Sequence, residues 1–481
     1  MTVRTLQHFI EGVWRDADAI RFEEIPNPAT GDILARVPHA AASAVDTAVR
    51  AAQAAFPSWR DTPVVERARV MFRYHQLLED HLDELARLVT DENGKTLEEA
   101  AGEVRRGIEV VEFACGAPTL MMGEVLEDVA RGVDSELVRV PLGVVAGICP
   151  FNFPAMIPLW MLPVALACGN AFVLKPSDRT PITAVRLAEL LADTELPRGV
   201  FNLVHGAKET VDALLAHPGV RAVSFVGSAP VAKYVYETAG AYGKRVQALA
   251  GAKNHLVVMP DCDLPRTAAA ILSSAFGNAG ERCLAGSLVV AVGNIGDRLV
   301  AALRDGAARL RVGVGWDSAT EMGPVIRASH RERVVRFIEQ GLAEGAELLC
   351  DGRHAADGSG YFLGVTLFDR VRPEMTLAQE EIFGPVLGVI RARDLDEALA
   401  IVNRSRFGNM ACIFTGSGRA AREFRTRVEA GMVGINIGVA APMAFFPFVG
   451  WKGSFYGDLH ATGKDSVAFY TERRVVTTRW F

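Results

Sequence analysis

The residue best suited to catalytic chemistry is Cys283, which lies in the segment FGNAGERCLAG directly after Arg282. A free thiol has a pKa of about 8.5, and a neighbouring cation lowers that pKa and raises the thiolate fraction. Cys283 would then be a nucleophile. A lone cysteine is more often a small buried hydrophobic residue, so the segment by itself leaves both interpretations open.

Two further polar residues could assist such a nucleophile. Asn152 lies in PFNFP just after an apolar run, where its side-chain amide could donate to a developing oxyanion. Glu381 lies in EEIFGPV, just before a Gly-Pro turn. Either residue could equally serve a turn, because loop Asn and Glu often satisfy backbone groups.

Candidate phosphate and ribose groups follow two other strand-like runs. Gly227 and Ser228 end VSFVGS and precede a helical stretch, whose first N–H groups would suit a pyrophosphate. Lys175 and Asp178 end AFVLKPSD, where an acidic group could hold ribose hydroxyls. A plain turn is the competing interpretation at both places, and no GxGxxG fingerprint is present. The ten histidines form no HExxH motif and no zinc-like Cys/His spacing, so we predict no metal site.

The elements that must position these residues alternate between strands and helices. A β-rich start gives way to a long helical region from about residue 41 to 116, interrupted near 61–63 and 92–94. From residue 144, apolar strand-like runs alternate with amphipathic helices, which indicates parallel sheets in two α/β domains with a boundary near residue 250. The charge-free stretch between Arg139 and Lys175 contains five prolines, so we interpret it as protein core and not as a membrane span.

Composition narrows the class of protein further. The chain has 481 residues, a net charge of -6 and no long run of like charge, which argues against nucleic acid as a partner. The seven cysteines include no CxxC pair, and the N-terminus has no apolar signal segment. We therefore expect a cytoplasmic protein without a disulfide framework and without a membrane anchor.

Taken together, the motifs resemble the aldehyde dehydrogenase superfamily. They occur in that family's order from about residue 140 to 457: PFNFP, FVLKPSDRTP, GVFNLVHG, VSFVGS, GAK, the Cys283 segment, EEIFGPV, GINIG and FPFVGWKGSFYG. The resemblance implies an α/β fold with a Rossmann-like NAD domain, a catalytic α/β domain and a small bridging segment that builds homodimers or homotetramers. The expected boundaries are 1–121 with 141–250 for the NAD domain, 251–454 for the catalytic domain, and 122–140 with 455–481 for the bridging segment.

The resemblance also assigns roles by position. Cys283 becomes the nucleophile and Asn152 the oxyanion-hole donor. The NAD site is expected to comprise Cys149, Phe151, Lys175, Asp178, Arg179, Ser228, Ala250 and Glu381, with Glu381 on the nicotinamide ribose. Asp178 stands where many relatives have Glu, which still favours NAD over NADP.

One departure from the family pattern concerns the deacylating base. Hydrolytic members have a Glu four residues before the lysine of ELGGK, whereas this chain reads LAGAK and has Leu249 there. Without that base, hydrolysis of an acyl-enzyme should be slow, and an incoming thiol needs less activation than water. An aldehyde dehydrogenase that does not use CoA, with a relocated base, is the alternative.

Together with EVRRGIE and NAGERC, this departure makes the chain similar to CoA-acylating methylmalonate-semialdehyde (malonate-semialdehyde) dehydrogenases. In that group, arginines matching Arg106 and Arg282 are associated with the substrate carboxylate. Guanidinium groups suit this task because they can bind a carboxylate through two parallel hydrogen bonds. The expected small-molecule partners are therefore NAD, a semialdehyde and CoA.

Overall fold

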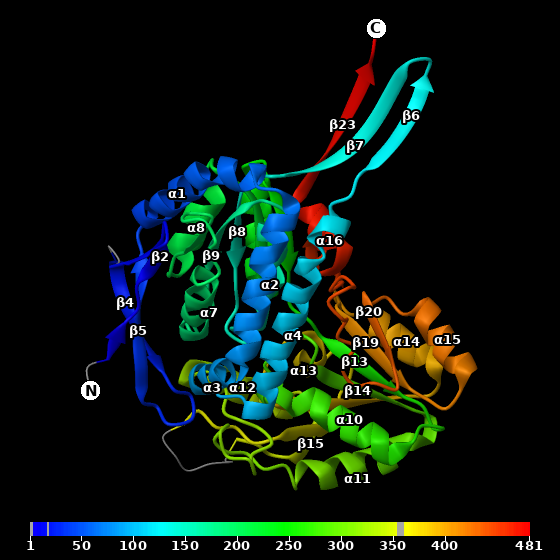
Figure 1. The fold of residues 1–481 in the computed structure, drawn as a ribbon. Coiled ribbons are helices and arrows are strands. Elements are labelled where there is room, and N and C mark those ends of the chain that lie inside the picture. Colours follow the sequence, from blue (N-terminus) through cyan, green and yellow to red (C-terminus); the bar gives the residue numbers. More distant parts are fainter. Residues whose placement is uncertain (1–2, 17–18, 354–359) are drawn as a thin grey trace.

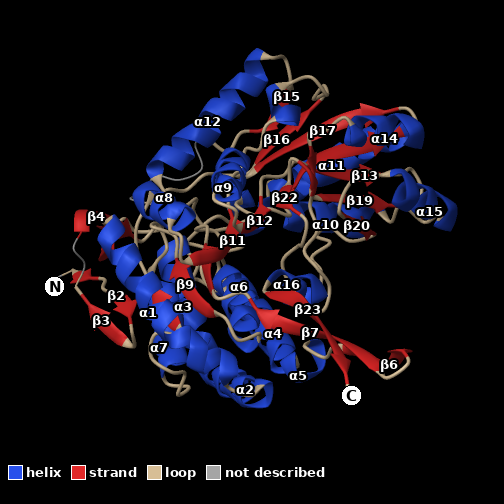
Figure 2. Cartoon of the chain, turned by 90° about the horizontal axis from the view of Figure 1, so that it is seen from above, coloured by secondary structure: helices blue, strands red, loops and turns tan. Residues whose placement is uncertain are grey.

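The computed structural model describes residues 3–16, 19–353 and 360–481. Two large sheets with helices on their faces form the body, and a thin three-stranded arm extends away from it (Figures 1 and 2). The alternation of strands and helices expected after residue 144 is confirmed. No helix within the described residues is long and apolar enough to cross a bilayer.

The first sheet has eight strands in the order β22-β12-β11-β8-β9-β10-β2-β3, of which the middle five are parallel. Chain order runs outward from β8 to β9 and β10, and then to β11 and β12 on the other side of β8. This order places a topological switch point at the carboxyl ends of β8 and β11, where α/β sheets bind ligands. The strands are β2 (His8–Ile10), β3 (Val13–Arg15), β8 (Val144–Ile148), β9 (Ala171–Lys175), β10 (Phe201–Leu203), β11 (Val220–Val226), β12 (Arg245–Leu249) and β22 (Phe455–Gly457).

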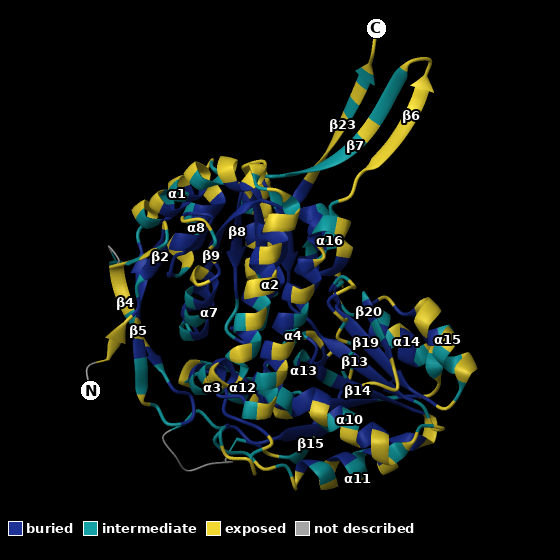
Figure 3. Ribbon diagram, in the orientation of Figure 1, coloured by how far each residue is buried: buried dark blue, intermediate teal, exposed yellow. Residues whose placement is uncertain are grey.

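Helices bury this sheet on both faces, so its central strands are apolar along their length. All residues of β8 and β9 are buried (Figure 3). Nearly all of α6, which also lies in the charge-free stretch, is buried as well. The prediction that this stretch is core is thus confirmed. The helices packed with this sheet are α1 (Ala42–Asp61), α6 (Met156–Ala167), α7 (Ile182–Ala192), α8 (Lys208–Ala216) and α9 (Ala229–Ala241).

The second sheet has seven strands in the order β15-β16-β17-β14-β13-β19-β20 and is parallel except for β15. Its strands are β13 (Asn254–Val258), β14 (Gly286–Val292), β15 (Glu347–Cys350), β16 (Thr366–Asp369), β17 (Val386–Ala392), β19 (Met410–Phe414) and β20 (Met432–Ile435). Its helices are α10 (Leu264–Phe276), η1 (Gly277–Gly280), η2 (Gly293–Ile295), α11 (Gly296–Ala307), α12 (Ala328–Ala343), α13 (Thr376–Gln379), α14 (Leu395–Asn403) and α15 (Gly418–Arg427).

The helical region predicted from residue 41 continues beyond α1 as α2 (Val64–Asp80), α3 (Leu82–Asn93), α4 (Leu97–Cys115) and α5 (Ala117–Leu120). Both predicted interruptions are confirmed. Gly94 ends α3 with a φ of 94°, a left-handed conformation that glycine adopts without strain. Thr96 and Glu99 then form a capping box that starts α4. Helix α4 packs along α6, which brings it next to the loop that follows β8.

The arm consists of β6 (Glu124–Ala130), β7 (Val133–Pro141) and β23 (Thr471–Arg479), in the order β23-β7-β6. Of the segment 455–481 that was expected in the bridging part, the arm contains only β23. Strand β22 pairs with β12 in the eight-stranded sheet, and α16 (Gly463–Phe469) packs against α6. Strand β23 begins at Thr471, shortly after α16 ends at Phe469.

Two small sheets complete the fold. One comprises β1 (Arg4–Thr5), β5 (Ile33–Ala40) and β4 (Ala19–Pro26), and the other β18 (Phe407–Gly408) and β21 (Trp451–Lys452).

Candidate active site

Cys283 lies between η1 and β14, at the amino end of the seven-stranded sheet. Its backbone carbonyl accepts hydrogen bonds from Asn254 Nδ2 at 2.8 Å and from Asn409 Nδ2 at 2.9 Å. The preceding turn is tight, because Asn278, Ala279 and Gly280 are all left-handed. This part of the backbone is therefore held from two neighbouring strands and cannot shift independently of the sheet.

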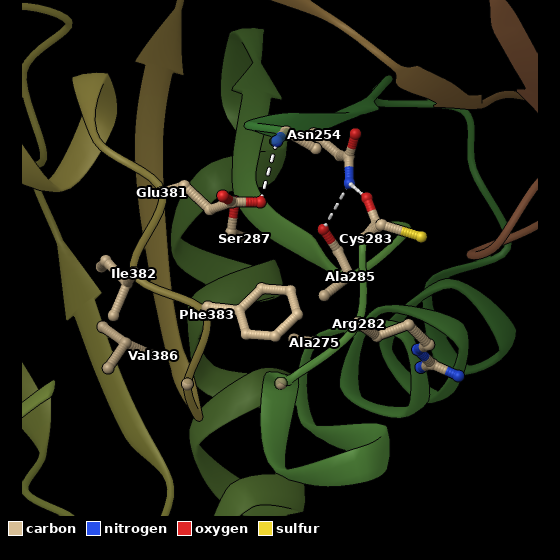
Figure 4. A pocket seen from close by; sticks show the side chains of 13 residues that line it. Asn254, Ala275, Arg282, Cys283, Ala285, Ser287, Glu381, Ile382, Phe383 and Val386 are labelled. Carbon is tan, nitrogen blue, oxygen red and sulfur yellow. Dashed lines mark hydrogen bonds between the residues drawn. The ribbon is translucent and has the colours of Figure 1, made fainter. Parts of the chain in front are cut away.

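Two cavities share Cys283. Arg282 also lines both; the smaller cavity is otherwise lined by Glu381 and Phe383, and the larger, of about 400 Å³, by Arg106. In Figure 4 the sulfur of Cys283 points away from Glu381, and the Arg282 side chain also extends away from Glu381. Cys283 and Arg282 thus adjoin both spaces, of which the smaller also contains Glu381 and the larger Arg106.

The pKa of the Cys283 thiol is raised to about 12. Burial is the largest cause, the nearby carboxylate of Glu381 adds to it, and Arg282 acts in the opposite direction. The expected sign of the Arg282 effect is confirmed, but the expected net lowering of the pKa is wrong. The physical reason is that loss of hydration destabilises the thiolate by more than the nearby Arg282 guanidinium, which is also bonded to backbone carbonyls, stabilises it.

Asn152 comes close to Cys283 from the other sheet. It lies on the loop after β8, and its Nδ2 donates to the carbonyl oxygen of Glu281 at 2.9 Å. An amide nitrogen carries two hydrogens, so this bond leaves one for a second acceptor. The expected oxyanion donor is therefore bonded to Glu281, which lies two residues before the expected nucleophile in the chain.

The expected cofactor residues gather at the carboxyl ends of the eight-stranded sheet. Ser228 is exposed and caps α9 without using its side chain, which leaves the amides of the first turn open to a ligand. Lys175 is buried at the end of β9, and burial lowers its pKa. For Asp178, burial acts to raise the pKa, but Lys175 and Arg179 outweigh it and the net shift is downward. The guanidinium of Arg179 lies 5.1 Å from the ring centroid of Phe151.

Three further members of the expected NAD set occupy different environments. The Cys149 thiol is buried in the core and lies 3.9 Å from Met161 Sδ. Ala250 is buried, and its backbone N–H donates to Ser454. Glu381 accepts a hydrogen bond from the Ala252 N–H at 2.8 Å, and burial raises its pKa to about 7.

Both expected substrate arginines line the larger cavity. Arg106 Nη1 lies 3.0 Å from Glu109 Oε2, one turn along α4. Arg282 Nη2 donates to the carbonyl oxygens of Ser273 and Ser274, whereas its Nε is buried without a hydrogen-bond partner. The cavity thus presents two guanidinium groups to any ligand that reaches Cys283.

Within the described residues, one group has the composition of a metal site. Ligand atoms of Glu23, His39 and Asp178 come within 4.8 Å of one another. However, His39 Nδ1 accepts a hydrogen bond from Arg21 Nε at 2.8 Å. Its other ring nitrogen, Nε2, lies 3.2 Å from Glu23 Oε2. Arg21 thus occupies one ring nitrogen of His39, and Glu23 is the charged neighbour of the other.

Several residues that support the site are not among those predicted from the sequence. Asn254 and Asn409 hold the Cys283 carbonyl, and Asn278 Nδ2 donates to the carbonyl oxygens of both Asn152 and Glu281. A usable signal was present for Asn254, a polar residue at the start of the apolar run NHLVV. For Asn409 and Asn278 only the three-dimensional arrangement reveals the role.

Comparison with known proteins agrees with this geometry. The model of the aldehyde dehydrogenase family matches residues 14–476. The chain belongs to the aldehyde dehydrogenase family. Its fold matches that of solved members, so the predicted fold class is confirmed.

Several individual members of the family are similar to this chain over its full length. Malonate-semialdehyde dehydrogenase 2 of Geobacillus thermodenitrificans is 59% identical over 478 residues, covering 99% of each chain. The crystal structure of methylmalonate-semialdehyde dehydrogenase from Oceanimonas doudoroffii is 50% identical with a TM-score of 0.98, covering 99% of each chain. A putative methylmalonate-semialdehyde dehydrogenase from Sinorhizobium meliloti, complexed with NAD, is 45% identical with a TM-score of 0.98, covering 100% of this chain and 98% of that one. Identity at this level supports aldehyde oxidation.

Proposed function

We propose that this aldehyde dehydrogenase oxidises malonate or methylmalonate semialdehyde with NAD and transfers the decarboxylated acyl group to CoA. The products are NADH, CO2 and acetyl-CoA or propionyl-CoA. The observation that carries the proposal is the cavity of about 400 Å³ in which Arg106, Arg282 and Cys283 meet. A semialdehyde has a carboxylate at one end and an aldehyde at the other, so it can bind the guanidinium groups while its aldehyde carbon reaches the sulfur.

The residues at the carboxyl ends of the eight-stranded sheet fit NAD. The open first turn of α9 suits a pyrophosphate, and Asp178 offers a carboxylate for ribose hydroxyls while disfavouring the phosphate of NADP. Glu381, on the small-cavity side of Cys283, would hold the nicotinamide ribose. The similar Sinorhizobium meliloti protein was solved with NAD, which supports the assignment.

The residues of this chain account for the first half of the reaction. The Cys283 thiolate attacks the aldehyde carbon, and the free hydrogen of Asn152 Nδ2 donates to the oxygen as negative charge develops on it. Arg282 stabilises the thiolate, because it is the nearby group that lowers the Cys283 pKa. NAD, when bound, accepts the hydride of the thiohemiacetal carbon, which leaves a thioester on Cys283.

The second half follows from the chemistry of a β-carboxyl thioester. Its carboxylate leaves as CO2 because the thioester carbonyl stabilises the resulting enolate, which then takes up a proton. Leu249 is apolar and buried at the end of β12, so it cannot activate water as a glutamate would. The thiol of CoA therefore attacks the thioester carbonyl and releases Cys283.

A second candidate function rests on Glu381. Its pKa of about 7 is suited to a general base, and it lines the same small cavity as Cys283. If Glu381 activated water, the enzyme would hydrolyse the acyl-enzyme and would not need CoA.

One assay separates the two candidates: NADH formation from malonate semialdehyde and from propanal, each with and without CoA. The proposal predicts a burst of about one NADH per subunit without CoA, followed by sustained turnover once CoA is added. Steady release of free acid at a similar rate without CoA would favour Glu381-assisted hydrolysis.

The same assay tests the substrate class through Arg106→Leu. A hydrogen bond to a charged group contributes about 1.5–3 kcal/mol, so kcat/KM for the semialdehyde should fall roughly tenfold to a hundredfold. Propanal has no carboxylate and should be oxidised almost as before. An equal effect on both substrates would make Arg106 a structural residue, for which its contact with Glu109 offers an explanation.

A further inference from the structure

A buried ion pair lies beside the catalytic loop. Lys95 Nζ is 2.6 Å from Glu103 Oε2, and both side chains are completely inaccessible to water. Lys95 precedes α4 and Glu103 lies in its second turn, so the start of one helix fixes both charges. Two buried charges are costly unless further polar groups compensate them, which raises the question of what this pair holds.

The remaining hydrogen bonds of the pair all go to the loop that carries Asn152. Lys95 Nζ donates to the Asn152 carbonyl oxygen at 2.7 Å and lies 4.2 Å from the ring centroid of Phe153. Glu103 Oε1 accepts from the Ala155 N–H at 2.8 Å and from the Met156 N–H at 3.1 Å. The pair thus ties down both ends of the short segment 152–156.

From these contacts we infer that Lys95 and Glu103 are positioning residues, which orient the Asn152 amide as the oxyanion donor. The inference rests on the proposed role of Asn152 and extends it to a pair of charges on another element. Because Lys95 holds the carbonyl of Asn152 itself, the peptide plane that follows the donor cannot rotate. A rotation there would move Nδ2 relative to Cys283, and a displacement of about 1 Å can cost roughly a hundredfold in rate.

A simple clamp for loop stability is the competing explanation, and a double-mutant cycle with Asn152 distinguishes the two. Lys95→Met alone would leave Glu103 as an unpaired buried charge and could prevent folding. The variant to use is therefore Lys95→Met combined with Glu103→Gln, which removes both charges and keeps a side-chain oxygen for the Ala155 and Met156 amides. This double variant is made in the wild-type background and in Asn152→Ala.

If the pair acts through Asn152, the double variant lowers kcat for NADH formation by about tenfold to a hundredfold in the wild-type background. In the Asn152→Ala background the further loss should be less than about threefold, since coupled residues are not additive. KM for NAD should stay within about twofold of the wild-type value. An equal loss in both backgrounds, or no loss in either, would overturn the inference.

A matched control and a second substrate complete the design. Lys244 is another buried lysine that donates to backbone carbonyls, those of His217 and Val220, at the amino ends of β11 and β12, whereas the Asn152 loop follows the carboxyl end of β8. Lys244→Met should lower thermal stability without changing kcat. Propanal serves beside the semialdehyde because every aldehyde develops an oxyanion. Failure of the CoA or carboxylate proposals would leave the propanal result intact.

Discussion

The thiol of Cys283 lies among charges that act on its pKa in opposite directions, with Glu381 raising it and Arg282 lowering it. Burial raises this pKa most and Glu381 adds to it, so we expect the thiol form to predominate near neutral pH in the free enzyme. Reactivity must then be acquired when cofactor and substrate enter. This arrangement protects a nucleophilic cysteine from adventitious modification in the absence of substrate.

Alkylation of Cys283 by iodoacetamide tests this balance. For the free enzyme, the rate should rise about tenfold per pH unit from pH 7 to 10 without a plateau, since the thiol pKa is about 12. Glu381→Gln should accelerate alkylation at a fixed pH, and Arg282→Leu should slow it. Mass spectrometry of the Cys283 peptide gives the rate. A plateau below pH 9 would contradict the raised pKa.

The chain also contains a buried carboxyl group next to the nucleophile. Burial raises the pKa of Glu281 to about 8, although its Oε1 accepts a hydrogen bond from the Ile326 N–H. A carboxyl group with a raised folded-state pKa stabilises the fold fully below its unfolded pKa near 4.5. That contribution is lost as the pH rises through 8, by about 1.4 kcal/mol per unit.

The stability of Glu281→Gln should therefore depend on pH differently from that of the wild type. Glutamine keeps an oxygen for Ile326 and does not ionise. Near pH 5 the two proteins should have similar melting temperatures, or the variant a lower one, and between pH 5 and 8 the variant should gain steadily on the wild type. Differential scanning calorimetry across this range measures the gain. A pH-independent difference would show that Glu281 is not protonated in the folded enzyme.

At the scale of elements, the sequence predicts most of what surrounds the site. Apolar strands, amphipathic helices and the breaks at Gly94 and Pro63 follow from local physics, because period and turn residues act over a few positions. The contacts of Lys95 and Asn278 with Asn152, and of Asn409 with Cys283, do not, because each joins segments more than fifty residues apart in the chain. Only the packing of α4 on α6, and of one sheet beside the other, creates them.

The tight turn before Cys283 gives a prediction at this scale. Gly280 has a φ of 71°, and a Cβ there would lie 2.3 Å from the Gly384 carbonyl oxygen. Gly280→Ala should therefore push the Cys283 segment away from the turn before β17. We expect a loss of at least about a hundredfold in kcat, or insoluble protein, since both backbone strain and a steric clash arise.

Gly240→Ala is the matched control for that variant. Gly240 lies in α9 with nothing within 4 Å of an added Cβ, and alanine is the better helix former. Activity and melting temperature should be unchanged or slightly higher. Near-normal kcat in Gly280→Ala would show that the turn can relax without moving the nucleophile.

At the scale of the whole molecule, the arm is the feature that a single chain leaves incomplete. Strand β6 is exposed along its whole length and forms a free edge (Figure 3). Large apolar side chains of the arm are also exposed, among them Val125 at 70% and Leu126 at 64% on β6 and Val475 at 67% on β23. Contiguous apolar surface and an unpaired strand edge are features of interfaces between chains.

We accordingly propose that the arm joins copies of this chain into homodimers or homotetramers. Replacing Val125 and Leu126 with Asp should convert the assembly to a smaller species, because charges would be buried at the interface. Light scattering coupled to size exclusion measures the mass. A monomeric wild type would refute the proposal, and so would an unchanged mass in the variant.

The separation of the two cavities around Cys283 has a kinetic consequence. The small cavity contains Glu381, the residue expected on the nicotinamide ribose, and the larger cavity contains Arg106, while Cys283 and Arg282 line both. The Cys283 sulfur points away from Glu381 (Figure 4). An inhibitor that fills only the larger cavity should therefore compete with the aldehyde and leave the apparent affinity for NAD unaffected. Small dicarboxylates such as malonate, which match the charge of that cavity, are natural first compounds for selective inhibition of this enzyme.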